Sequence, residues 1–108
     1  MEVRLFALQR LSAMFLAPLV MVHLGLILYA VGGGLTADEI LARTQGNVGW
    51  ALFYGVFVLA ASVHAPIGVR NVLKEWTPWR KRSLDVAMLI LAAALLAMGL
   101  RAVWAVIQ

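Results

Sequence analysis

The chain has 108 residues, of which 64% are hydrophobic and 13% are charged, and its formal net charge is +4. Soluble domains hold roughly 45–50% apolar and about 25% charged residues. A chain this short buries only part of its unfolded surface when it folds, so it cannot hide so many apolar side chains internally. The composition therefore excludes a soluble fold and predicts that lipid covers the apolar surface.

Cysteine is absent, which excludes disulfides, thiolate metal sites and iron–sulfur clusters from this chain. The basic residues flank apolar stretches, where Lys and Arg contact anionic headgroups and set topology. The positive charge thus indicates lipid, and no nucleic acid, as the partner.

Three apolar segments, at residues 11–33, 48–72 and 84–107, each exceed the roughly 20 residues that a helix needs to cross the hydrocarbon. Helices are favoured over strands because a backbone in lipid must satisfy its own hydrogen bonds, and no segment alternates as a barrel strand does. The predicted fold class is all-α, a bundle of three transmembrane helices that forms a single membrane domain over residues 1–108.

The connections between the spans carry helix-capping signals. Thr36 and Glu39 have the spacing of a capping box, which predicts a short surface helix over about residues 37–43. In the second connection Pro78 ends the preceding helix, and Ser83 is expected to cap the third span.

The distribution of Lys and Arg predicts the orientation. Only Arg43 lies in the first connection, whereas the N-terminal flank and the second connection hold most of the others: Arg4, Arg10, Arg70, Lys74, Arg80, Lys81 and Arg82. Cytoplasmic flanks are enriched in Lys and Arg. We therefore expect a multi-pass protein of the inner (cytoplasmic) membrane, with its N-terminus in the cytoplasm and its C-terminus outside.

Two histidines, His23 and His64, lie within the predicted spans, where ionisable residues are costly and mark functional sites. Counted from the cytoplasmic ends, both should lie about 15–20 Å deep, and imidazoles at one level are what a bis-histidine haem requires. The helical neighbours of His64 are mostly small and would admit a porphyrin, but small residues also let helices pack closely. The neighbours of His23 are bulky, and a hydrogen bond to another helix explains that residue equally well.

A second polar group is predicted at the cytoplasmic ends, with Arg10 and Ser12 on the first span and Trp76 on the second. Such donors suit the carbonyl oxygens of a quinone, although snorkelling of long side chains explains the same pattern. No phosphate loop, hydrolytic triad, paired carboxylates or zinc motif is present, so no catalytic residues are predicted.

Two motifs carry a family resemblance: Gln9-Arg10-Leu11-Ser12-Ala13 and His64-Ala65-Pro66-Ile67-Gly68-Val69-Arg70. Together with Glu75 and Trp76, they resemble the membrane-anchor subunits of succinate dehydrogenase and fumarate reductase. The resemblance implies that His64 is the iron ligand of haem b, and that Arg10 and Ser12 border the quinone or a haem propionate. Gly68 matches the motif glycine, and Trp76 takes the place of the family's quinone-contacting tyrosine, although an indole cannot accept a hydrogen bond.

The resemblance further implies a non-catalytic subunit of a succinate:quinone oxidoreductase, the respiratory complex II of the tricarboxylic acid cycle. Its partners would be a flavoprotein and an iron–sulfur subunit, and the chain would pass electrons between the latter and ubiquinone or menaquinone. A second haem ligand would come from His23, from a second anchor subunit or from a second copy of this chain. Two alternatives remain: a haem-free anchor of a related flavoprotein complex, and a small structural or transport subunit of the membrane.

Overall fold

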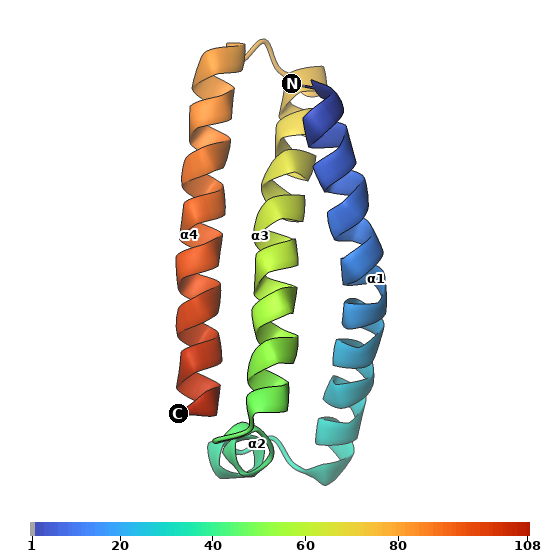
Figure 1. Ribbon diagram of the computed structural model, residues 1–108, viewed down its shortest axis with the longest axis vertical. Coiled ribbons are helices and arrows are strands. Elements are labelled where there is room, and N and C mark those ends of the chain that lie inside the picture. Colours follow the sequence, from blue (N-terminus) through green and yellow to red (C-terminus); the bar gives the residue numbers. More distant parts are fainter. Residues whose placement is uncertain (1) are drawn as a thin grey trace.

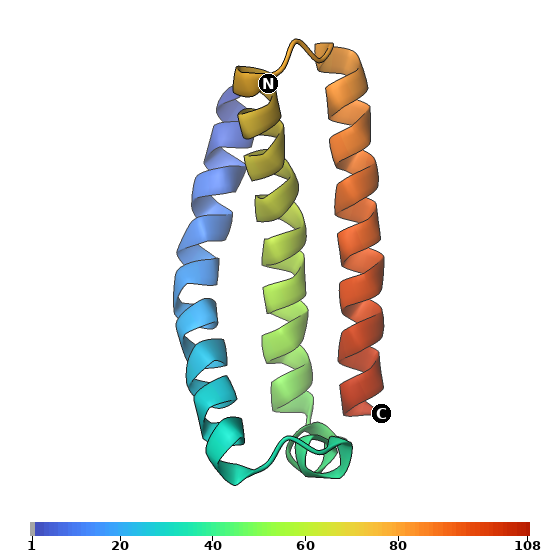
Figure 2. The ribbon, with the colours of Figure 1, turned by 180° about the vertical axis from the view of Figure 1, so that it is seen from behind.

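The computed structural model describes residues 2–108 and consists of four helices: α1 (Glu2–Gly33), α2 (Ala37–Thr44), α3 (Val48–Trp76) and α4 (Lys81–Ile107). Figure 1 shows α3 between α1 and α4, with the short α2 lying across one end, and the view from behind agrees (Figure 2). The three long helices are long and apolar enough to cross a membrane. The predicted all-α fold with three spans is confirmed, and no strand occurs among residues 2–108.

The helices extend beyond the apolar segments that predicted them. The helix α1 begins at Glu2 and α3 continues to Trp76, so the bundle is 47 Å long, against about 30 Å of hydrocarbon. Hydropathy marks only the part in lipid, while the helical backbone continues into the interface. The predicted cap by Ser83 is wrong, because α4 already begins at Lys81 and the Ser83 hydroxyl instead accepts a hydrogen bond from Trp79 Nε1 at 2.9 Å.

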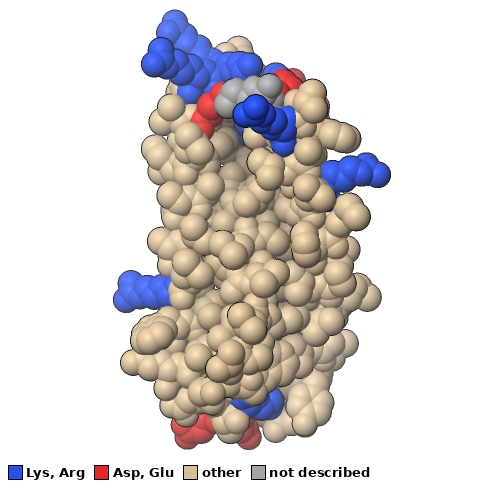
Figure 3. Space-filling model, in the orientation of Figure 1, with Lys and Arg blue, Asp and Glu red and all other residues tan. Residues whose placement is uncertain are grey.

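The surface of the bundle is apolar and its interior is partly polar. The accessible area is 7736 Å², whereas a soluble monomer of this mass exposes about 5,900 Å². Three apolar residues are buried among those described, Pro66, Ile67 and Leu84, and four buried residues are polar or charged: Ser12, Thr44, Ser62 and Arg70. Lys and Arg gather mainly at the end that holds the N-terminus (Figure 3), and between the two ends the surface is predominantly uncharged, as lipid requires.

The predicted capping box at the start of α2 is confirmed. Glu39 N donates to Thr36 Oγ1 at 3.2 Å, and Thr36 N donates to the Glu39 carboxylate at 3.0 Å. These bonds, the backbone one first, lower the pKa of Glu39, so the box stabilises the fold at neutral pH and weakens as the pH falls through that lowered value. Gly34, at φ +127°, leaves the space for this carboxylate that a Cβ would occupy.

The last carbonyl groups of α4 have no hydrogen-bond partners within the helix, and residues at the end of α2 and directly after it donate to them. Thr44 Oγ1 donates to Val106 O at 2.7 Å, and Gly46 N donates to Ile107 O at 2.6 Å. A third bond runs from the Gln45 side chain to the Gln108 carbonyl at 2.9 Å. Residues more than fifty positions apart are thereby joined at this end of the bundle.

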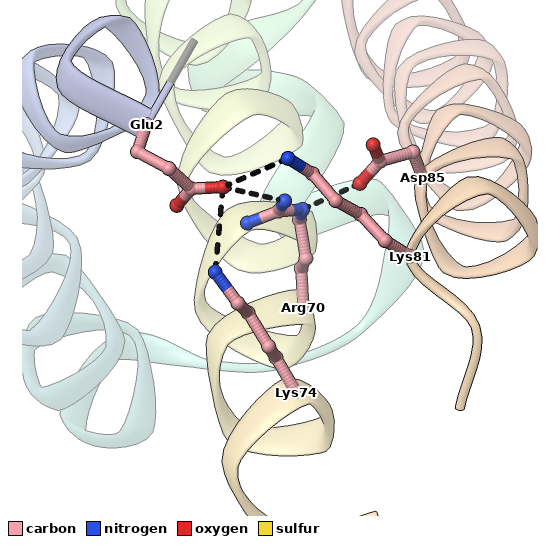
Figure 4. Close-up of polar contacts among 5 residues, drawn as sticks. All are labelled: Glu2, Arg70, Lys74, Lys81 and Asp85. Carbon is pink, nitrogen blue, oxygen red and sulfur yellow. Dashed lines mark hydrogen bonds and ion pairs between the residues drawn. The ribbon is translucent and has the colours of Figure 1, made fainter. Parts of the chain in front are cut away.

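At the opposite end, a group of charged residues joins the three spans (Figure 4). Arg70 of α3 is only 3% exposed; its Nε donates to Asp85 Oδ1 of α4 at 2.6 Å, and its Nη2 donates to Glu2 Oε1 of α1 at 3.0 Å. Lys74 and Lys81, both at least half exposed, lie 3.4 and 3.9 Å from the same Glu2 oxygen. We call these five residues the ion cluster.

Gly99 of α4 allows α3 and α4 to approach closely. A Cβ added to Gly99 would lie 2.5 Å from Cγ1 of Val58, so only glycine fits this contact.

We predict that Gly99→Leu lowers the free energy of unfolding by about 1–3 kcal/mol, because the larger side chain forces α4 away from α3. Gly25→Leu is the matched control, since nothing lies within 4 Å of a Cβ at that position. Thermal unfolding in detergent micelles, followed by helical circular dichroism, measures both. Equal melting temperatures for the two variants would contradict this packing.

Asp85→Asn is expected to lower the free energy of unfolding by about 2–3 kcal/mol, because a buried guanidinium loses one of its two carboxylates. The control, Lys81→Gln, removes an exposed charge 3.9 Å from Glu2 and should cost less than about 1 kcal/mol. The same melting experiment compares them, and a Lys81→Gln variant as unstable as Asp85→Asn would refute the central role of Arg70.

Candidate functional site

His64 lies on α3 where it faces the first third of α1. Its Nδ1 is 3.2 Å from Ser12 Oγ and 3.4 Å from the backbone oxygen of Gln9. The Ser12 hydroxyl donates to the same Gln9 oxygen at 3.0 Å and is itself buried. The structure thus brings together His64 and Ser12, two of the residues that the sequence singled out.

These contacts fit the tautomer of His64 that carries its proton on Nδ1. In that tautomer Nδ1–H can donate to the Gln9 carbonyl oxygen, which only accepts, while the Ser12 hydroxyl donates to the same oxygen. The lone pair of the neutral ring then lies on Nε2, which makes no hydrogen bond to any residue between 2 and 108. Metal-binding histidines have this arrangement, with the second ring nitrogen oriented by a backbone or side-chain acceptor.

Gly68, one turn after His64, is in contact with the Gln9 side chain. A Cβ at Gly68 would lie 3.3 Å from Gln9 Nε2, which is a tight contact. The other amide atom, Gln9 Oε1, is buried and has no hydrogen-bond partner among the described residues. Gln9, which the sequence analysis named only as part of a motif, therefore contacts both His64 and Gly68.

Arg10 and Trp76 are not brought to this group. Arg10 is exposed and Trp76 is 83% exposed, and neither side chain makes a hydrogen bond or ion pair with a residue between 2 and 108. Both side chains are therefore outside the group formed by His64, Ser12 and Gln9.

His23 lies at a different level from His64, and the expected equal depth is wrong. Ser12 is the α1 residue level with His64, and His23 is eleven residues further along, about 16 Å at 1.5 Å per residue. The ring of His23 packs edge-on against Tyr54 and Phe57, with ring centroids 5.8 and 5.3 Å away. The error arose because the depth of each histidine was counted from the cytoplasmic end of its apolar segment, and the ends of the two segments do not lie at the same depth.

The surroundings of His23 form a separate site near α2. Its Nδ1 is buried without a partner among residues 2–108, and the residue lines a cavity of about 320 Å³ together with Tyr54, Phe57 and Gly99. In the observed arrangement His23 and His64 cannot bind one iron from opposite sides, because both axial nitrogens of a haem must lie within a few ångströms of the metal.

The ion cluster lies at the same end of the bundle as His64, and sequence reasoning did not assign it. Arg70 was named among the polar residues at the cytoplasmic ends, but its partners Glu2 and Asp85 were not. A signal was present, since Arg70, although counted with the basic residues of the second connection, lies within the last residues of the predicted segment 48–72, where a charge requires compensation.

Comparison with known protein families gave a match. The model of the family described as succinate dehydrogenase/fumarate reductase transmembrane subunit matches residues 1–104, nearly the whole chain. No curated protein and no solved structure gave a significant match. With three apolar helices and a family match of this length, the chain belongs to the transmembrane subunits of succinate dehydrogenase and fumarate reductase.

Proposed function

We propose that this chain anchors a flavoprotein and an iron–sulfur subunit to the inner (cytoplasmic) membrane. It binds haem b and a quinone, and it passes electrons between the iron–sulfur subunit and the quinone. The haem assignment rests on the hydrogen bonding of His64. Its Nδ1 lies against Ser12 and the Gln9 backbone of α1, and its Nε2 makes no hydrogen bond to a described residue. A haem bound there would supply one-electron transfer between the iron–sulfur subunit and the quinone. His64 would hold the iron, while Ser12 and the Gln9 backbone hold the imidazole in its orientation.

The second axial ligand is proposed to come from outside this chain. His23 is about 16 Å away along the bundle and is enclosed by Tyr54 and Phe57. A second anchor subunit or a second copy of this chain would supply the missing imidazole. Any group that His23 itself binds would be a separate one, at the level of α2.

The soluble partners are proposed to dock at the end that holds the ion cluster, with this end in the cytoplasm. Lys and Arg gather there (Figure 3), as the positive-inside rule requires. The exposed Arg10 and Trp76 face outward near this end and would contact ubiquinone or menaquinone together with residues of a partner.

A haem-free anchor of the same family is the second candidate, and one observation favours it. Gly68 is explained by the contact with Gln9, so the small motif glycine does not need a porphyrin to account for it. In this alternative His64 serves only to join α1 to α3.

We predict that the purified complex has a b-type band in its reduced-minus-oxidised spectrum and that His64→Ala abolishes the band, because the iron loses its ligand from this chain. The matched control is His23→Ala, which should retain the band, since His23 lies at another level. A band that survives in His64→Ala, or that is absent from the unmodified complex, would favour the haem-free anchor.

Ser12→Ala should lower haem affinity by about 10–100-fold and shift the midpoint potential, because the imidazole loses its nearest hydrogen-bond acceptor. Ser12→Thr keeps the hydroxyl and is expected to restore both properties. Redox titration of the b-type band, with haem content measured as the pyridine haemochrome, separates this role from simple packing. Identical potentials for Ser12→Ala and the unmodified protein would rule out an orienting role for Ser12.

A further inference from the structure

Residues of α1, α3 and α4 line a cavity of about 250 Å³ toward the end of the bundle that holds the ion cluster. Its walls are mostly apolar and include Leu8 of α1 and Leu89 of α4. Arg70 and Asp85 line its charged end, whereas Ala92 lies seven residues after Asp85, about 10 Å further along α4. We call this cavity the Arg70 groove. Its charged end is followed, along the axis of the bundle, by apolar walls.

The ion cluster borders the charged end of the Arg70 groove (Figure 4). Lys74 of α3 and Lys81 of α4 place their ammonium groups 3.4 and 3.9 Å from the same Glu2 oxygen, and both side chains are at least half exposed. The side chain of Arg70 is 3% exposed, and its Nη1 is buried without a hydrogen-bond partner among residues 2–108. An unpaired buried donor is costly, so an acceptor from outside the chain is favoured at this end of the groove.

The ion cluster carries a net positive charge. Its three cations, Arg70, Lys74 and Lys81, face the two carboxylates of Glu2 and Asp85, which leaves one positive charge uncompensated. All three cations lie between 3.0 and 3.9 Å from one oxygen, Glu2 Oε1. A ligand with a single negative charge would neutralise the cluster, and it would not have to be buried to reach the two exposed lysines.

The surroundings of the ion cluster add to this positive charge. Arg4, Arg80 and Arg82 are exposed at the same end of the bundle, against one further acidic residue, Glu75. Lys and Arg gather at this end on the surface that Figure 3 shows. An anion at the membrane surface is therefore attracted to this end, because each Lys or Arg near the surface contributes to the attraction.

We infer that the Arg70 groove binds one anionic phospholipid, with its phosphate group against Lys74 and Lys81 and one acyl chain along the apolar walls. The order of the groups matches, because a phospholipid places its charge at the interface and its chains in the hydrocarbon. One phosphodiester supplies the single negative charge that the ion cluster lacks. A zwitterionic headgroup would bring a further cation to the two lysines and is therefore disfavoured. This inference goes beyond the proposed function, since it requires neither haem nor quinone.

The headgroup is tested with two phospholipids that differ in headgroup charge. The full chain is purified in a non-ionic detergent, mixed with equal amounts of phosphatidylglycerol and phosphatidylcholine of identical acyl chains, and analysed by native mass spectrometry. We expect the unmodified chain to bind phosphatidylglycerol about tenfold more tightly, and the double variant Lys74→Gln/Lys81→Gln to lose this preference. Arg101→Gln, which removes an exposed cation nearer the other end of α4, is the matched control and should keep the preference.

The acyl chain is tested by filling the groove without changing the ion cluster. Ala92→Phe places a ring among the lining residues, and Ala94→Phe, at an exposed position of α4 that does not line the groove, is the matched control. We expect Ala92→Phe to bind about tenfold less phosphatidylglycerol than Ala94→Phe, because the acyl chain loses its contact with the apolar walls. Melting curves show whether both variants fold, and Ala92→Leu, with a smaller side chain, replaces Ala92→Phe if that variant is unfolded.

Three results would overturn the inference. The first is equal binding of the two phospholipids by the unmodified chain, or a preference for phosphatidylglycerol that survives in Lys74→Gln/Lys81→Gln. The second is equal binding of phosphatidylglycerol by folded variants at Ala92 and Ala94, which would leave a charged surface without a groove. The third is a dimer of the chain that substitution at Ala92 dissociates with bound lipid unchanged, which would assign the groove to a second copy. If no substitution at Ala92 folds, the lysine variants alone decide.

Discussion

A charge buried between membrane helices has to be compensated there, and in this bundle the charge is Arg70. Its side chain is 3% exposed and is held by one carboxylate from α1 and one from α4. In hydrocarbon, apolar side chains gain nothing by leaving lipid for one another, so polar contacts and close packing have to position the helices. Arg70 therefore joins all three spans at one end, while hydrogen bonds from the segment after α2 join the other end.

The ion cluster also sets the level at which α1 meets α3. From Glu2 to Ser12 is ten residues, about 15 Å, and from Arg70 back to His64 is six, about 9 Å. The two stretches therefore differ by about 6 Å along the helix axis. With the helix end fixed in this way, the Ser12 hydroxyl reaches His64 Nδ1 and the imidazole presents its other nitrogen. We therefore expect the orientation of the proposed ligand to depend on the contact of Glu2 at the N-terminal end of α1.

The sequence was sufficient for the features that depend on local pattern. Three apolar runs predicted three spans, and the spacing of Thr36 and Glu39 predicted the capping box, because hydrophobicity and capping act within a few residues. The register between helices could not be obtained in the same way. The apolar run of α1 begins at Leu11 while the helix begins at Glu2, so depths counted from apolar edges put His23 level with His64. Glu2 and Asp85 were overlooked because an acidic residue beside a basic flank is expected to be solvated. The structure instead places both carboxylates against Arg70.

The separation of the two histidines limits what a single copy can do. His64 has its orienting partners on α1, but the other histidine packs against Tyr54 and Phe57 nearer to α2, so the chain offers one imidazole at each of two depths. A haem held by two histidines at His64 would consequently need its second histidine from another chain. Haem binding is therefore expected to depend on assembly.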